Sequence, residues 1–201
     1  MLKQLFYILT FIFILCGCSL RHETINKNEN IILKDEGIDS NIFFKKTGKI
    51  LKIRNANAPL YLNSRAIVYI DNGFSNKYAH YFWGDLPNNL YQSLLLSKFE
   101  QSQIFKALLS QGSSVRSDYI LESRIDSFEQ VVDENENYVS ISISINFIDA
   151  KESKIIAHRL FSIKERVKKI DIFDVYQSFE KALNSLGNEI VLWINATLDE
   201  K

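Results

Sequence analysis

The length, composition and charge of the chain set the first limits on its function. The chain has 201 residues, and its 24 lysines and arginines are balanced by 24 aspartates and glutamates, so the formal net charge is zero. A chain with this balance has no basic surplus for binding nucleic acid, and its length is enough for one domain with a sizeable hydrophobic core.

The first residues are typical of a signal peptide for export. Lys3 is followed by an almost unbroken apolar run from Leu5 to Leu15. A charged start, an apolar stretch of about 7–15 residues and a small-residue exit describe a secretory signal. A membrane-spanning helix needs about 20 apolar residues, which is more than this run offers.

Both cysteines of the chain lie two residues apart at the end of this signal, in the stretch FILCGCSL. A redox pair is normally spaced C-x-x-C, and a zinc site needs about four ligands. Of the histidines, His22 lies in the polar segment that follows, while His80 and His158 are isolated. We therefore expect neither a redox pair nor a metal site here.

The stretch resembles the lipobox of bacterial lipoproteins, with Leu15 at −3, Cys16 at −2, Gly17 at −1 and Cys18 at +1. The lipoprotein peptidase requires a small residue before the acylated cysteine, and Gly17 meets that requirement for Cys18. The resemblance implies cleavage between Gly17 and Cys18, and an N-acyl chain such as palmitate plus an S-diacylglycerol on Cys18. Because Ser19 is not aspartate, the sorting pattern favours the outer membrane. An ordinary cleaved signal or an uncleaved anchor is the alternative.

Composition divides the chain into three segments. We expect a signal peptide at 1–17, an acylated N-terminus and flexible tether at 18–47, and one folded domain at 48–198. The tether is polar and rich in Asn, Lys and Glu, which is typical of segments that bury little apolar surface. Its piece Ile42-Phe43-Phe44 could still dock on the domain.

The first half of the domain is predicted to contain three strands and a helix. The strands are expected at 49–54, 66–70 and 78–83, with a turn at 71–73. Asp85 is the expected N-cap of the helix, Pro87 lies in its first turn, and leucines recur at three- to four-residue spacing. Residues 102–112 are ambiguous, and 104–109 could form a short further strand.

The second half of the domain is predicted to be an antiparallel meander followed by a long helix. Strands at 119–128, 140–147 and 155–167 are joined by polar turns, and the middle one alternates serine with isoleucine. A helix from about 171 to 196 carries one apolar stripe. The sequence therefore predicts a single α/β domain of the α+β type, in the order β-β-β-α-(β)-β-β-β-α. Its sheet is mixed and largely antiparallel, and two main helices cover one face.

No motif in the chain assembles an active site. The sequence lacks G-x-S-x-G, a glycine-rich phosphate loop and H-E-x-x-H. The acidic cluster at 133–137 is explained as a solvated hairpin turn, and calcium binding there is the weaker alternative because the EF-hand glycine and closing glutamate are missing. His158, beside Arg159, is expected to be a surface pair or a hydrogen-bonded histidine. We predict a protein that is not an enzyme and has no metal or cofactor beyond the acyl groups.

Several short motifs together resemble one known family. After the lipobox and tether come LYL at 60–62, RAIVY at 65–69, YAHYFWGDLP at 78–87, DYILESRIDSFE at 118–129 and VLWI at 191–194. In this order and spacing they look like the ABC-type transport auxiliary lipoprotein family, which includes paraquat-inducible protein C. Two positions depart from the family: Ile70 stands where arginine is common, and Phe82 precedes Trp83 where arginine is frequent.

The resemblance implies a non-enzymatic role in the cell envelope of a Gram-negative bacterium. Family members accompany Mce-type (MlaD-like) periplasmic proteins and ABC permease–ATPase complexes that move phospholipids or other hydrophobic molecules. They act at the outer membrane, facing the periplasm. Trp83 and Tyr69 are the family-matched positions for a structural or partner contact, and we expect Trp83 to brace the first helix on the sheet. The alternatives are a periplasmic carrier that itself holds a lipid or acyl chain, and an envelope lipoprotein that activates another assembly machine.

Overall fold

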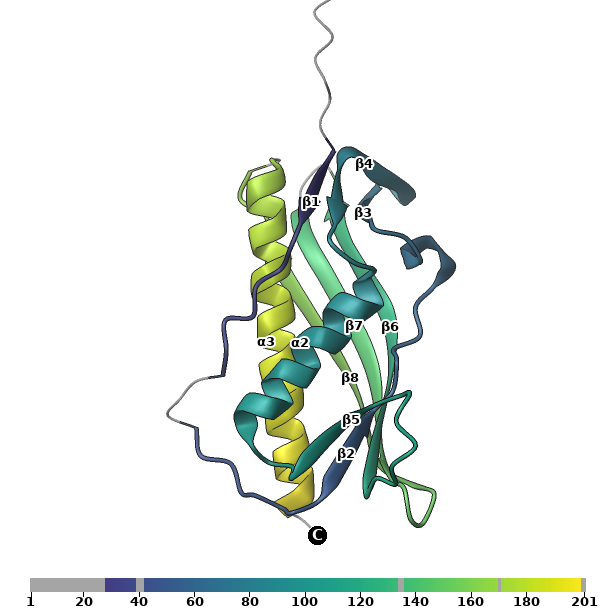
Figure 1. Ribbon diagram of the computed structural model, residues 1–201. Helices are drawn as coiled ribbons and strands as arrows, with labels where there is room; N and C mark the ends of the chain where they lie inside the picture. The colour runs from purple at the N-terminus through teal and green to yellow at the C-terminus, as the bar shows by residue number, and fades with distance from the viewer. Residues whose placement is uncertain (1–27, 39–41, 134–135, 170, 200–201) are drawn as a thin grey trace, which may run out of the picture.

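The structure, a computed structural model, describes residues 28–38, 42–133, 136–169 and 171–199. One open sheet carries two long helices, which cross each other on the same face (Figure 1). In chain order the elements are β1 (Glu29–Ile31), β2 (Ile50–Ile53), the short helix η1 (Leu60–Leu62), β3 (Ala66–Asp71), β4 (Phe74–Trp83), α2 (Pro87–Ser102), β5 (Ala107–Ser110), β6 (Tyr119–Val132), β7 (Asn137–Asp149), β8 (Lys154–Arg166) and α3 (Ile172–Asp199).

The long strand β6 is the centre of the eight-stranded sheet. Along one side it pairs antiparallel with β7, which in turn pairs antiparallel with β8. Its other side is shared, because β2 pairs in parallel with its beginning and β3 pairs in parallel with its end. β5 lies outside β2, while β4 and then β1 lie outside β3. The predicted mixed, largely antiparallel sheet is confirmed, since the longest ladders are antiparallel.

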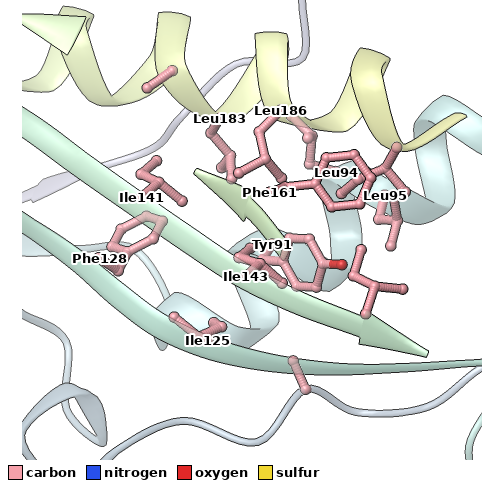
Figure 2. Packing of buried hydrophobic residues seen from close by; sticks show 14 of the residues in the cluster. Tyr91, Leu94, Leu95, Ile125, Phe128, Ile141, Ile143, Phe161, Leu183 and Leu186 are labelled. Carbon is pink, nitrogen blue, oxygen red and sulfur yellow. The ribbon is translucent and has the colours of Figure 1, made fainter. Parts of the chain in front are cut away.

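The helices cover the apolar face that strand alternation creates. Every second residue of β7 is fully buried beneath them: Val139, Ile141, Ile143, Ile145 and Phe147. Figure 2 shows Ile141 and Ile143 on the side of the sheet that faces Leu183 and Leu186 of α3. Full burial of each such side chain stabilises the fold by about 1.5–3 kcal/mol. The predicted placement of two helices on one face is confirmed.

The N-cap of the first helix lies one residue later than expected. α2 starts at Pro87, and its N-cap is Leu86, which makes no side-chain capping bond. The Asp85 carboxylate instead accepts hydrogen bonds from the Leu86 N–H (2.7 Å) and the Asn89 side chain (2.9 Å). Asp85 therefore stabilises the turn into the helix from just outside it, and its assignment as N-cap was wrong by one position.

The two helices approach each other closely at Gly187 of α3. A Cβ atom at this position would lie 2.7 Å from Leu94 Cδ2 of α2, well inside van der Waals contact. A side chain at this position would force Leu94 to shift, so glycine allows the helices to cross at this distance without repacking.

The segment before β2 differs from the tether expected at residues 18–47. β1 pairs in parallel with β4, which places Ile31 beside Trp83. Residues 32–38, which we call the strap, then run across the helix layer, and Leu33 and Ile38 pack against the core. Scattered apolar residues of this kind give no periodic signal in the sequence, yet they are enough to dock an extended segment on a preformed surface.

Smaller differences concern element ends. Within Ile42-Phe43-Phe44, Phe44 packs on the core, whereas Phe43 is 95% exposed. β4 begins at Phe74, directly after the turn, and is four residues longer at its start than the expected strand at 78–83. The ambiguous stretch at 102–112 contains a strand, β5, which runs from Ala107 to Ser110 and so begins three residues later than the possible strand at 104–109.

Candidate functional site

The lipid anchor, the leading site prediction from the sequence, lies outside the described residues. Gly17 and Cys18, the expected cleavage and acylation positions, precede Asn28, at which the described chain begins. The acyl groups on Cys18 therefore stay a prediction.

Trp83 lies in the core at the end of β4. Its side chain is 1% exposed and makes edge-to-face contacts with Phe128 of β6 (ring centroids 5.7 Å apart) and Phe179 of α3 (4.9 Å). Phe128 and Phe179 also contact each other at 5.1 Å, so the three rings form one cluster. We expected Trp83 to brace the first helix on the sheet, but its ring contacts join the sheet, through Phe128, to the last helix, through Phe179. Because the Trp83 ring is buried, it contributes packing energy and leaves no surface for a partner protein to contact.

Tyr69 is half-buried on β3 and lies apart from the Trp83 cluster. Its ring makes an edge-to-face contact with Tyr78 of β4, with centroids 5.4 Å apart. The Tyr78 hydroxyl donates to Oε1 of the fully buried Gln130 (2.6 Å), whose amide donates to Asn137 Oδ1 (2.7 Å). Burial raises the pKa of Tyr78, so it stays a neutral donor. These contacts join β3, β4, β6 and β7 at one end of the sheet.

A buried ion pair fastens the strap to α2. Lys98 is fully buried, and its Nζ lies 2.8 Å from Asp35 Oδ1 and also donates to the Gly37 carbonyl oxygen. Asp35 further accepts hydrogen bonds from Ser97 Oγ (2.5 Å) and Gln101 Nε2 (2.7 Å). Burial alone would raise the pKa of Asp35, but hydrogen bonds from Lys98 and two neighbouring donors outweigh burial and lower the pKa to about 2. Asp35 is therefore ionised at neutral pH and neutralises the buried cation.

A buried asparagine of α3 holds the backbone of the strap. Asn184, 3% exposed, accepts the Glu36 N–H through Oδ1 (2.9 Å) and donates to the Lys34 carbonyl oxygen through Nδ2 (2.8 Å). The Lys34 N–H donates to Glu180 Oε2 (2.7 Å). One amide side chain thus supplies both a donor and an acceptor to an extended segment, as a neighbouring strand would. The strap is tied to α2 by Lys98 and to α3 by Asn184.

The strap was not predicted from the sequence, although two residues carried a signal. Lys98 falls at the helical spacing of Tyr91 and Leu94, which are buried, and Asn184 follows Leu183 within the apolar stripe of α3. A cation or an amide at a core position of an amphipathic helix needs a buried partner. The need for a partner could have been anticipated, but not which segment supplies it.

The face of the sheet that the helices leave free is polar and carries a groove of about 670 Å³. At this groove Arg54 is paired with Glu122, and Arg124 Nε lies 2.6 Å from Asp126 Oδ1. Burial would raise the pKa of Asp126, but hydrogen bonds from Arg124 and Ser144 lower it, so the carboxylate stays charged. Because each arginine has its own carboxylate, the groove presents compensated charges and hydrogen-bonding groups.

His158 lines the same groove and has a hydrogen-bond partner. Its Nδ1 lies 2.8 Å from Asn146 Oδ1 on the neighbouring strand β7. Adjacent residues of a strand point to opposite faces, so Arg159 lies on the other side of β8, over the Phe161 ring at 4.7 Å. Of the two expectations for His158, the structure supports the hydrogen-bonded histidine.

Neither a metal centre nor a membrane span is found in the described part of the chain. There, no group of three or more His, Cys, Asp and Glu side chains is arranged to hold a metal ion. Within the same ranges, no helix combines the length and the apolar character needed to cross a bilayer.

Comparison with known proteins gives one family match and one curated relative. The family model described as "ABC-type transport auxiliary lipoprotein component" matches residues 41–191. The uncharacterized protein bll6063 of Bradyrhizobium diazoefficiens is 26% identical over 143 residues, which are 71% of this chain and 38% of that protein. The chain thus spans less than half of that relative.

Solved structures share the fold. Protein XCC0632 from Xanthomonas campestris has a TM-score of 0.75 at 19% identity, over 82% of this chain and 94% of that one. The hypothetical protein CT253 from Chlamydia trachomatis has a TM-score of 0.59 at 8% identity, over 77% of this chain and 100% of that one. At these identities the likeness concerns the fold alone.

Proposed function

Because the chain belongs to the ABC-type transport auxiliary lipoprotein family, we propose that it is a non-catalytic, lipid-anchored auxiliary component of an ABC transporter. The observation that carries this proposal is the family match over residues 41–191, which includes every strand from β2 to β8 and most of α3. The partners we propose are a Mce-type (MlaD-like) periplasmic protein and an ABC permease–ATPase complex. The cargo we propose is phospholipid or another hydrophobic molecule that crosses the envelope of a Gram-negative bacterium.

The strap supports a role in which the domain is held close to a membrane. Only residues 19–27 separate the proposed acylated Cys18 from Asn28, and a chain of that length spans at most about 35 Å. From Asn28 the chain enters β1 and then the strap. The strap is bonded to α2 and α3, so the segment that follows the proposed anchor is fixed to the folded domain. With two or three acyl chains on Cys18, membrane attachment would be firm, and we propose the periplasmic side of the outer membrane.

The packing of the core favours the auxiliary role over a lipid carrier. A carrier would need a wide apolar pocket, and the isoleucine face of β7 was the one candidate in the sequence. In the structure Ile141, Ile143 and Ile145 are fully buried beneath the helices. Native mass spectrometry of the purified protein tests this choice, because a stoichiometric bound phospholipid would favour the carrier.

Two experiments test the proposal. The anchor is tested by metabolic labelling with palmitate: Cys18→Ser should abolish labelling, and Cys16→Ser, the matched control, should retain it. Labelling of the Cys18→Ser variant would show that the lipobox assignment is wrong.

The partnership is tested by purifying the acylated protein from membranes in mild detergent. We expect a permease, an ATPase and a Mce-domain protein to co-purify. Recovery of a different envelope machine without any of these components would refute the transport role and favour the activator alternative.

A further inference from the structure

The strand β8 forms a long open edge of the sheet. It is 13 residues long and, among the described strands, pairs only with β7. In an edge strand, backbone N–H and C=O groups on the outer side have no ladder partner, and they can template the addition of another strand. At the end of β8 the Arg166 carbonyl oxygen already accepts a hydrogen bond from Ser178 Oγ of α3 at 3.2 Å, so the open stretch of the edge lies before Arg166. The other edges among the described strands are shorter: β5 has 4 residues, and β1 covers only residues 81–83 of β4, which leaves residues 74–80 of β4 open.

This edge also carries a surplus of positive charge, although the chain as a whole has none. The only acidic residue of β8, Glu165, is engaged by Lys181 of α3 at 2.7 Å. The basic residues of β8 and the two that follow it shortly are Lys154, His158, Arg159, Lys164, Arg166, Lys168 and Lys169.

The cations at the end of β8 are exposed and positioned along its rim. Lys164 lies opposite Ser140 of β7 on the helix-free face, and its Nζ is 4.4 Å from the centre of the Tyr138 ring. Arg166 lies opposite Tyr138 on the same face. Both side chains are exposed, and their cross-strand neighbours on β7 are Ser140 and Tyr138.

We propose that β8 docks an extended acidic segment of a partner protein, which adds to the sheet as a further strand. Backbone hydrogen bonds would supply the pairing, and carboxylates of the segment would lie near Lys164 and Arg166. A second copy of this chain is the wrong occupant, because antiparallel pairing of two β8 strands about their centre places Lys154 opposite Arg166, and like charges directly opposite are destabilising.

The docking is tested with the full acylated chain in detergent and short synthetic peptides. The probe alternates glutamate and valine; one control replaces glutamate with lysine, and a second replaces valine with proline, which keeps the charge but cannot form a strand. We expect that only the glutamate–valine peptide binds and that it slows amide hydrogen exchange at alternate residues of β8. Binding should weaken as salt is raised.

Charge reversal supplies the matched variants. Lys164→Glu with Arg166→Glu should weaken binding of the acidic peptide by about tenfold. Lys77→Glu with Lys106→Glu reverses two exposed charges away from β8 and should leave binding unchanged. Equal binding by the proline peptide would show charge attraction without strand addition and would overturn the proposal.

Three further outcomes would also overturn it. If no peptide binds, the cations serve only to keep a bare edge from pairing. If phosphatidylglycerol nanodiscs slow the amide hydrogen exchange of β8 but the peptide does not, the basic edge faces anionic lipid. If amide exchange of β8 slows as the protein concentration is raised without any peptide, the edge joins two copies of the chain. None of these outcomes depends on whether the transporter components co-purify, so this proposal and the transport role fail separately.

Discussion

Removing the Asp35 carboxylate should destabilise the protein more than removing the Lys98 ammonium group, although the two form one ion pair. Lys98 is fully buried, whereas the Asp35 side chain is 22% exposed. Asp35→Ala therefore leaves a buried cation with only the Gly37 carbonyl oxygen as a partner. Lys98→Met leaves a partly hydrated carboxylate that still accepts bonds from Ser97 and Gln101.

The expected losses of unfolding free energy follow from the burial of Lys98 and the partial exposure of Asp35. Leaving one member of a buried pair without its partner costs about 3–5 kcal/mol of unfolding free energy. The strap can detach and readmit water to Lys98, so we expect Asp35→Ala to cost about 3 kcal/mol, at the low end of that range. Lys98→Met removes the charge and keeps most of the stem, so it should cost about 1 kcal/mol. The double variant should be more stable than Asp35→Ala alone, because the orphaned cation is gone.

The same pair predicts a dependence on pH. The pKa of Asp35 in the folded protein is about 2, against an ordinary value of 3.8. The folded state thus binds fewer protons, and its stabilisation is present above about pH 4 and is lost as the pH falls toward 2. Because Asp35 is partly exposed, solvent screening reduces the stability that this shift represents, and the difference between wild type and Asp35→Asn should shrink across this window.

The assay is urea denaturation of the unacylated chain, followed by circular dichroism, for the wild type, both single variants and the double variant. Hydrogen exchange in the strap shows whether residues 32–38 detach in Asp35→Ala. A larger loss of unfolding free energy for Lys98→Met than for Asp35→Ala would contradict the unequal burial of the two groups, as would a double variant that is the least stable of the set.

Three further substitutions test the packing by the same denaturation assay. Trp83→Ala should cost about 3–5 kcal/mol, because it empties a three-ring cluster; a cost below about 1 kcal/mol would contradict its place in the core. Tyr91→Phe should cost about 1–2 kcal/mol, since the buried Ser123 hydroxyl loses its partner at 2.9 Å; an unchanged midpoint would show that another group replaces it. Gly187→Ala should lower the melting temperature by a few degrees, because overpacking against Leu94 outweighs the gain in helix propensity; a higher melting temperature would show that the helices separate freely.

Much of the fold could be predicted because its elements are long and strongly periodic. The alternation of serine and isoleucine in β7 separates a buried face from an open one, and the stripe of α3 matches that buried face. The first helix was placed to within one residue at its start, because proline is tolerated only in the first turn. The order and type of the main elements therefore followed from local pattern.

The candidate site was less predictable, because it depends on contacts between distant residues. Asp35 and Lys98 are 63 positions apart, and Glu36 and Asn184 are 148 apart. Nothing in a polar segment indicates which helix it crosses. Trp83 was correctly singled out, but its neighbour Phe179 belongs to the last helix and not to the first.

The alternation of β7 and the apolar stripe of α3 follow from the sequence alone, because each is a pattern of residues close together in the chain, and the charge balance follows from composition. The lipobox-like stretch and the family motifs belong to the same class of local information. Only the tertiary structure decided that residues 32–38 form a strap, that Lys98 is buried, and that β8 rather than β7 is the long open edge. These features depend on which elements lie side by side, and strand order and helix crossing are set by the packing of the whole core.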